Sequence, residues 1–234
     1  MKIAICDDVI KDAENLLRII SDIQLLMNTE INIYTSSVEL LNKFNNNFLY
    51  DVVFLDIDLP DINGIELGKR IRTVTQDTYI VFVTKYPQYA IEAYDCEAFH
   101  YLLKPLEPQK VKKVLKSLIN SYQKNHAEYH FRTKSGYINI PIKDLYYVEC
   151  CKKHIIFHMK DRIIESPGKL SEVYSFLVNY DFCQVHQGYI VNMRKIINLN
   201  KLNIYLDNNE VIPISQRKKA DVLSRYAEYL GENC

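Results

Sequence analysis

The chain has 234 residues, 48% hydrophobic and 25% charged, which is enough for two domains of ordinary size. No apolar run is long enough to span a bilayer, and Asp7 and Asp8 come too early for a signal peptide. The six cysteines lack the paired spacing of zinc sites, and they do not form a recognisable disulfide framework. We therefore expect a cytoplasmic protein with free thiols.

The formal net charge is zero, but the two halves of the chain differ. Residues 1–125 contain 14 Lys and Arg against 17 Asp and Glu, whereas residues 126–234 contain 15 against 12. The basic surplus of the second half favours an anionic partner for that half.

The first half alternates strand-like and helix-like stretches. Short apolar runs predict strands over residues 3–6, 31–34, 52–55, 79–83 and 98–103. Apolar residues at helical spacing predict helices between them, including a first helix that extends through Met27 and a closing helix over residues 111–122. This alternation implies an α/β fold with a five-stranded parallel sheet.

From about residue 125 the pattern becomes mostly β. Ile138, Ile140 and Ile142 alternate with other residue types, which is strand spacing. Further strands are expected over residues 146–148, 155–157, 162–164, 188–191, 196–199 and 202–206. Helices are expected over residues 169–178 and from Ser215 onward, the latter with Val222, Leu223, Tyr226 and Leu230 on one face. This half therefore reads as a separate domain.

Polar side chains follow four of the strands predicted in the first half. They are, in strand order, Asp7 with Asp8, Asp56 with Asp58, Thr84, and Lys104. The carboxyl ends of parallel strands share one edge of the sheet, so these groups are expected to meet. Several carboxylates in one pocket repel one another unless a hard cation lies among them, and Mg²⁺ prefers such oxygen ligands.

This set of residues suits phosphoryl transfer. A carboxylate such as Asp56 can attack phosphorus and form an aspartyl phosphate. Such a transfer depends on positioning and charge neutralisation, which the metal and Lys104 would supply, while Thr84 would bond a phosphoryl oxygen. The alternative is that these are unrelated loop-edge residues, which their recurrence at successive strand ends disfavours.

The motifs resemble the receiver domain of bacterial two-component response regulators. They are Asp7-Asp8, Phe54-Leu55-Asp56, Leu59-Pro60 with Gly64, Val83-Thr84, and Leu103-Lys104-Pro105. The resemblance covers residues 1–122 and implies a flavodoxin-like fold with Asp56 as the phosphoacceptor. It also implies a Mg²⁺ site in which Asp8 binds directly, Asp7 through water, Asp56 by its side chain and Asp58 by its backbone carbonyl.

The same resemblance assigns Thr84 and Lys104 to phosphate binding and predicts a cis Lys104–Pro105 peptide. Tyr101 matches an aromatic switch that turns inward when Thr84 moves toward the phosphate. Lys85 departs from the family pattern, because the residue after the threonine is usually small. A cation there would narrow access to Asp56 or add a contact to the phosphoryl group.

Residues 182–192 and 212–217, with the strand at 145–149, resemble the LytTR DNA-binding domain. The resemblance covers residues 129–231, which leaves residues 123–128 as a linker, and it implies loops that enter successive major grooves. The matching loop residues are Lys152, Lys153, His154, Gln187, Arg217 and Lys218. The usual Arg-Ser after the histidine is replaced here by Gln187-Gly188.

These residue types suit DNA. Arg217 can read guanine, Gln187 can read adenine, and the lysines can contact phosphates. Other interpretations stay open: Lys218 with Lys219 reads better as a solvated helix face, and His186 reads better as a structural histidine beside a strand. Arg194 and Lys195 are either phosphate contacts or turn charges.

The leading hypothesis is a response regulator, phosphorylated on Asp56 by a sensor histidine kinase, that dimerises and binds tandem DNA sites to control transcription. Its only catalysis would be phosphoryl transfer to itself. A haloacid-dehalogenase-like phosphatase is an alternative, because Asp56-Ile57-Asp58 is an Asp-x-Asp motif. The acid pair about fifty residues earlier and Pro60 favour the receiver. A third possibility is a second domain that binds protein or RNA.

Overall fold

The computed structural model describes residues 1–23, 29–133 and 136–232, and the chain divides into two compact units, residues 1–122 and 123–234. None of the helices within the described ranges is long and apolar enough to cross a membrane. The cysteines that fall within them are all free, in agreement with the prediction.

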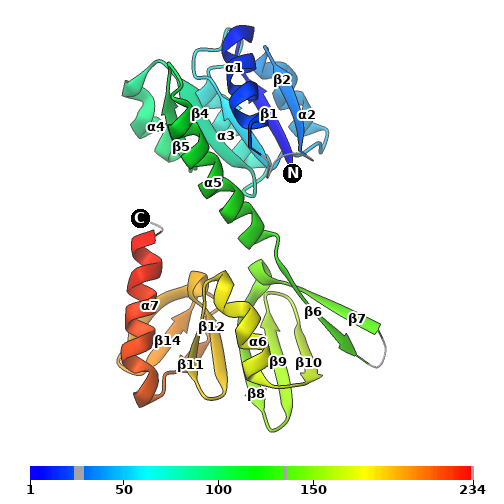
Figure 1. The fold of residues 1–234 in the computed structure, drawn as a ribbon, viewed down its shortest axis with the longest axis vertical. Coiled ribbons are helices and arrows are strands. Elements are labelled where there is room, and N and C mark those ends of the chain that lie inside the picture. The colour runs from blue at the N-terminus through cyan, green and yellow to red at the C-terminus, as the bar shows by residue number, and fades with distance from the viewer. Residues whose placement is uncertain (24–28, 134–135, 233–234) are drawn as a thin grey trace. The chain divides into compact units, whose positions relative to one another are not determined.

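Unit 1 is built around a five-stranded sheet in the order β2-β1-β3-β4-β5, with every strand parallel (Figure 1). The strands are β1 (Lys2–Cys6), β2 (Glu30–Tyr34), β3 (Val52–Leu55), β4 (Tyr79–Thr84) and β5 (His100–Leu103). This confirms the predicted α/β class. The strand order reverses between β1 and β3, and an open parallel sheet forms its binding crevice at such a point.

Helices cover both faces of this sheet. They are α1 (Ile10–Ser21), α2 (Ser37–Asn45), α3 (Gly64–Val74), α4 (Ala90–Asp95) and α5 (Pro108–Asn125). One apolar core joins α1 and α5 to the sheet, and a second joins α2, α3 and α4 to its other face. Because β3 is buried on both faces, all four of its residues are apolar. Helix α1 ends at Ser21, so the predicted extension was wrong as far as the described residues reach, and Met27 lies outside them.

Unit 2 is mostly β, as predicted. An antiparallel sheet runs in the order β10-β9-β8-β12-β11, a second in the order β13-β14-β15, and β6 and β7 form a hairpin (Figure 1). The strands are β6 (Glu128–Thr133), β7 (Gly136–Pro141), β8 (Leu145–Cys151), β9 (His154–Met159), β10 (Ile163–Pro167), β11 (Phe182–His186), β12 (Tyr189–Asn192), β13 (Ile196–Asn200), β14 (Asn203–Leu206) and β15 (Val211–Pro213). The helices are α6 (Leu170–Leu177) and α7 (Lys219–Glu232).

The larger sheet of unit 2 is packed on both faces. Successive residues of a strand point to opposite faces, so Val148 joins the core under α6 and the β6–β7 hairpin, whereas Tyr147 joins the core under β14 and β15. Helix α7 contributes Val222, which is 1% exposed, to the second core. Leu223 and Leu230 are each 44% exposed, so the buried stripe of α7 is narrower than its spacing suggested.

The junction between the units is largely helical. Helix α5 continues through Asn125, and β6 begins at Glu128. The first three residues of the segment interpreted as a linker therefore belong to a helix.

Candidate functional sites

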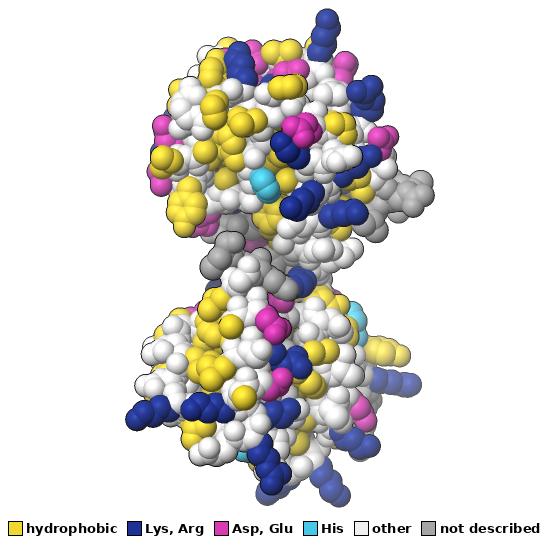
Figure 2. Space-filling model, turned by 60° about the vertical axis from the view of Figure 1, so that its left-hand side comes forward, with side chains coloured by type: hydrophobic (Ala, Val, Ile, Leu, Met, Phe, Trp, Pro, Cys, Tyr) yellow, Lys and Arg dark blue, Asp and Glu magenta, His cyan; other side chains and the backbone are white. Residues whose placement is uncertain are grey.

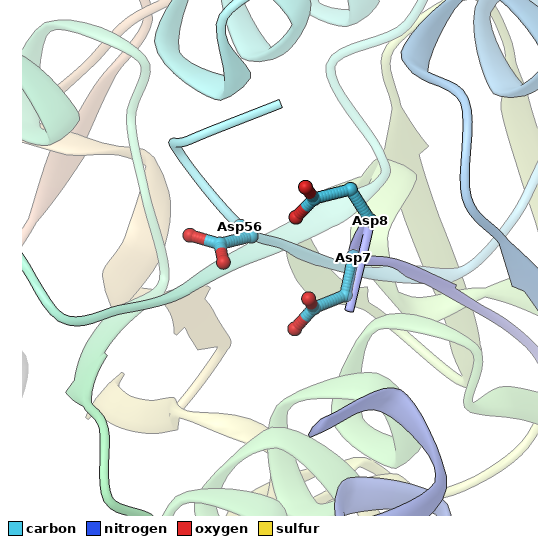
Figure 3. Close-up of side chains that lie close together, drawn as sticks. All are labelled: Asp7, Asp8 and Asp56. Atoms are coloured by element: carbon cyan, nitrogen blue, oxygen red, sulfur yellow. The ribbon is translucent and has the colours of Figure 1, made fainter. Parts of the chain in front are cut away.

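Three carboxylates meet at the carboxyl edge of the sheet in unit 1 (Figure 3). Asp7 and Asp8 follow β1, and Asp56 follows β3. One ligand atom from each lies within 4.8 Å of the others. Asp7 and Asp56 are 3% and 6% exposed, whereas Asp8 is exposed. Two buried acids beside a third form a strongly negative pocket that favours a cation.

Backbone amides fix one oxygen of each buried carboxylate. Oδ1 of Asp56 accepts hydrogen bonds from the N–H groups of Ile57 at 2.6 Å and Asp58 at 3.3 Å. Oδ1 of Asp7 accepts one from the N–H of Val9 at 3.0 Å. Each acid therefore has its Oδ2 atom left for a partner in the pocket.

That partner is Lys104, which follows β5. Its Nζ lies 2.6 Å from Oδ2 of Asp56, 2.7 Å from Oδ2 of Asp7 and 2.8 Å from Oδ2 of Asp12. Burial by itself lowers the pKa of Lys104, but the hydrogen bonds to Asp12, Asp56 and Asp7 outweigh burial and raise that pKa. An ammonium has three N–H donors, so these three carboxylates use all of them.

Asp12 is the one member of this arrangement that the sequence interpretation missed. It lies in the first turn of α1, four residues after Asp8, and its carboxylate is aligned with the pocket by the helix. The available signal was an acid in the first turn after the acid pair. Such acids are common at helix N-termini without any functional role, so that signal is weak.

Thr84 and the loop after it border the pocket. The Thr84 hydroxyl is fully buried at the end of β4 and accepts a 3.5 Å contact from the N–H of Tyr86. Nζ of Lys85 lies 3.5 Å from Oδ2 of Asp58. Contacts with Tyr86 and with Asp58 raise the pKa of Lys85. Asp58 also accepts a hydrogen bond from the Tyr86 hydroxyl at 2.9 Å, so its side chain is not part of the acid cluster.

Gly64 closes the loop behind Asp56. A Cβ atom at this position would lie 2.0 Å from the carbonyl oxygen of Asp56 and 2.8 Å from Cα of Ile57. The N–H of Gly64 donates to the carbonyl of Ile57 at 2.9 Å. The side chain of Asn63 caps α3, which begins at Gly64. The close approach requires glycine, because any side chain would push α3 away from the strand end.

Tyr101 lies on β5, three residues before Lys104. Its ring packs in a tilted arrangement with Phe82 at a centroid distance of 6.3 Å, and its hydroxyl donates to the carbonyl of Tyr86. Burial, with the charge of Asp56 as a smaller contribution, raises its pKa. The side chain is half-buried, and its hydroxyl bonds to the loop after β4, which also carries Lys85.

In unit 2, three loops lie at the same end of the larger sheet. Lys152 and Lys153 form the β8–β9 turn, where Lys152 has a φ of 57°. Gln187 lies in the β11–β12 turn, and the pairing of Tyr189 with Glu149 brings that turn beside the first. The segment after β15 joins them, because the N–H of Ser215 donates to the carbonyl of Val185 at 3.0 Å.

Two of these loops enclose a polar groove of about 490 Å³. Its lining residues are Gln184, His186, Gln187, Ser215, Gln216, Arg217 and Lys218. No carboxylate is among these lining residues, and amides and cations predominate. The groove therefore combines Gln187, Arg217 and Lys218 from the predicted set, and it adds Gln184 and Gln216, which the sequence interpretation missed. Lys152, Lys153 and His154 lie on the neighbouring β8–β9 hairpin instead.

Several histidines and arginines of unit 2 are already engaged. Nδ1 of His154 lies 2.6 Å from Glu165, and Nδ1 of His186 accepts the N–H of Gly188 at 3.2 Å. The guanidinium of Arg194 contacts Asp181 at 2.8 Å and also binds Asn125. The structure therefore supports a structural role for His186 and for Arg194. Lys195 lies over the ring of Tyr146 at 5.1 Å.

Comparison with known families and proteins finds a different family in each of the two units. Residues 3–116 match the response regulator receiver domain, and residues 135–226 match the LytTr DNA-binding domain. The transcriptional regulatory protein YpdB of Escherichia coli K12 is 27% identical over 195 residues, which cover 75% of this chain and 80% of YpdB. The sensory transduction protein LytT of Bacillus subtilis is 28% identical over 181 residues, which cover 71% and 75%.

Among solved structures, the response regulatory domain of MrkE from Klebsiella pneumoniae is 29% identical. It aligns with a TM-score of 0.48 and covers 53% of this chain and 98% of that one.

Proposed function

The chain is a two-component response regulator that joins a receiver domain to a LytTR DNA-binding domain, and we propose that phosphorylation of Asp56 controls its binding to promoter DNA. The observation that carries this proposal is the position of Asp56, buried at the end of β3 with its Oδ2 atom 2.6 Å from Lys104 and inside the acid cluster. We further propose that a cognate sensor histidine kinase supplies the phosphoryl group.

The acid cluster fits a hard divalent cation. Asp7, Asp8 and Asp56 offer oxygen ligands within 4.8 Å of one another, which is the chemistry that Mg²⁺ selects. We expect these three to hold Mg²⁺, with the backbone carbonyl of Asp58 as a further ligand because its side chain is directed to Tyr86. When bound, Mg²⁺ would neutralise negative charge on the transferring phosphoryl group.

The protein's own residues would carry out the transfer. Asp56 would attack phosphorus through Oδ2, since Oδ1 is held by two backbone amides. Lys104 would donate a hydrogen bond to a phosphoryl oxygen, and the Thr84 hydroxyl would donate another after a shift toward Asp56. Tyr101 would follow that shift and change the surface around β4, α4 and β5.

The output step would be DNA binding by the three loops of unit 2. Lys152 and Lys153 suit phosphates, Arg217 suits guanine, and Gln187 suits adenine. His154 would have to exchange Glu165 for DNA, and Lys218 would contact the backbone at the edge of the groove. Figure 2 shows Lys and Arg side chains at the end of unit 2 where α7 begins.

We propose the receiver over residues 1–122, a linker over residues 123–128 and the LytTR domain over residues 129–231.

Phosphorylation would pair two receivers through the α4–β5 face, where Ile91, Tyr94 and Leu103 are 81%, 84% and 48% exposed. Figure 2 shows hydrophobic side chains gathered on one face of unit 1. Two LytTR domains would then bind tandem half-sites with a raised effective concentration, in the cytoplasm where the DNA lies.

Labelling with a small phosphodonor tests the first step. Acetyl phosphate with Mg²⁺ should add one phosphoryl group to the wild-type protein, in an acid-stable and base-labile form. Asp56→Asn should abolish it, whereas Asp58→Asn, two residues along the same loop, should retain it. Label that persists on Asp56→Asn would contradict the assignment. Multiple-turnover hydrolysis of small phosphoesters would favour a phosphatase instead.

A further inference from the structure

Lys104 binds one carboxylate that lies outside the acid cluster. Asp12 reaches Nζ at 2.8 Å, as close as Asp7 and Asp56, yet the cluster of possible cation ligands consists of Asp7, Asp8 and Asp56. The side chain of Asp12 is 43% exposed, against 5% for Asp7 and 7% for Asp56. Asp12 thus lies on the solvent side of the ammonium.

This difference matters during phosphoryl transfer to Asp56, a step that rests on the function proposed above. Asp56 must release its Oδ2 atom from Lys104 before that oxygen can attack. Asp7 would share its Oδ2 atom with the cation site, since Val9 already holds its Oδ1 atom. Asp56 would attack phosphorus and Asp7 would also bind the cation, whereas the proposed function gives Asp12 no role other than its contact with Lys104.

The geometry points to Asp12 as a positioning residue that holds Lys104 at the mouth of the pocket while Asp56 exchanges the ammonium for phosphorus. With acetyl phosphate, a bond forms between Oδ2 of Asp56 and phosphorus, and the phosphorus–oxygen bond to acetate breaks. Acetate leaves with the bonding electron pair. Lys104 stays protonated, keeps one N–H on Asp12 and directs another to a phosphoryl oxygen.

A simple charge effect predicts the opposite result. A carboxylate near the pocket mouth repels an anionic phosphodonor, so removing it would speed the reaction. Glu14 lies two residues further along α1 and forms no ion pair with Lys104 in the described structure, so Glu14→Gln removes the same charge without removing the anchor.

The first test is the rate at which acetyl phosphate and Mg²⁺ phosphorylate Asp56. Asp12→Ala should slow it by about three- to fivefold, the size expected for a half-exposed ion pair. Asp12→Glu should restore most of the rate, and Glu14→Gln should stay within about twofold of wild type. Equal or faster labelling of Asp12→Ala would overturn the inference.

The second test uses the metal-free protein and does not depend on phosphorylation. An ammonium held by three carboxylates exchanges its protons slowly, so Lys104 should give a resolved ¹H–¹⁵N ammonium signal in wild type and in Glu14→Gln. Asp12→Ala should broaden or lose it, and an unchanged signal would contradict the anchoring role. If wild type is never labelled at Asp56, the proposed function fails while this signal still decides the role of Asp12.

Discussion

The acid pocket of unit 1 and the polar groove of unit 2 hold their functional side chains in opposite ways. In the pocket, Asp7, Asp12 and Asp56 are already bound to Lys104 at 2.6–2.8 Å. In the groove, the described structure gives Gln187 and Arg217 no side-chain hydrogen bond or ion pair, and Arg217 is exposed. The side chains of the pocket are therefore held by one another before any ligand binds, whereas the groove leaves its donors for the proposed DNA partner.

The two sites should therefore respond differently to mutation. A change in the pocket leaves a buried charge without its partner, so it disturbs the unliganded protein as well as the reaction. A change in the groove would remove only a proposed contact with DNA, so it should leave the free protein intact.

The largest effect is expected at Arg217. Arg217→Ala should weaken binding to the preferred DNA site by about 1–3 kcal/mol and relax base preference at one position, because a bidentate contact to guanine is lost. A duplex selected from a random pool by the wild-type protein would supply the site. Its single-base variants, measured at fixed salt, would show the relaxed position, and the melting temperature should not change.

Arg194 lies in the same domain as Arg217 but is bound to Asp181 within the protein, so Arg194→Ala is the matched control for Arg217→Ala. Arg194→Ala should lower the free energy of unfolding of the protein by about 1–2 kcal/mol, since it leaves Asp181, 13% exposed, with Lys124 as its remaining cation. Sequence preference on DNA should be unchanged. Denaturant unfolding gives the first value, and unchanged stability would contradict the structural role of this guanidinium.

Lys153 tests the phosphate contacts. Lys153→Ala should weaken binding to matched and mismatched duplexes by the same factor and should reduce the slope of log K against log salt by about one. A titration at three salt concentrations measures both. A loss confined to the matched site would instead make Lys153 a base reader.

The smallest effect is expected at Lys85. Its Nζ lies 3.5 Å from the carboxylate of Asp58 on the surface, and the described structure gives Lys85 no hydrogen bond or ion pair to Asp56. Lys85→Ala should therefore change the lifetime of the phosphorylated protein, but by less than about threefold, the scale of an exposed ion pair. Decay of the label after removal of the phosphodonor measures it. A tenfold change would show that Lys85 reaches the phosphoryl group.

The position of the acid pocket could be predicted because the carboxyl ends of parallel strands lie at the same edge of the sheet. Asp7 and Asp56 each follow a buried strand, and Lys104 follows the edge strand β5, so the expectation that they meet needed only the parallel strand ends and no knowledge of side-chain geometry. Asp12 was missed because a helix, not a strand end, brings it there. The orientation of Lys85 toward Asp58 depends on the Tyr86 hydroxyl, a contact that no sequence pattern encodes.

The second domain was harder to predict in detail. Its mostly-β character follows from alternating apolar residues, but β6, β11 and β15 were not expected. The groove contains Gln184 because β11 is the outer strand of its sheet, and strand order cannot be read from spacing. The exposure of Leu223 and Leu230 likewise depends on how much of α7 the sheet can cover.

An affinity measurement tests the claim that phosphorylation of Asp56 controls DNA binding. A duplex with two selected half-sites would be titrated with the protein before and after treatment with acetyl phosphate and Mg²⁺, in parallel with Asp56→Asn. We expect treatment to tighten binding by at least about tenfold in wild type, as two linked domains gain effective concentration, and to have no effect on Asp56→Asn. Equal affinity of the treated and untreated wild-type protein, at full labelling, would contradict the claim.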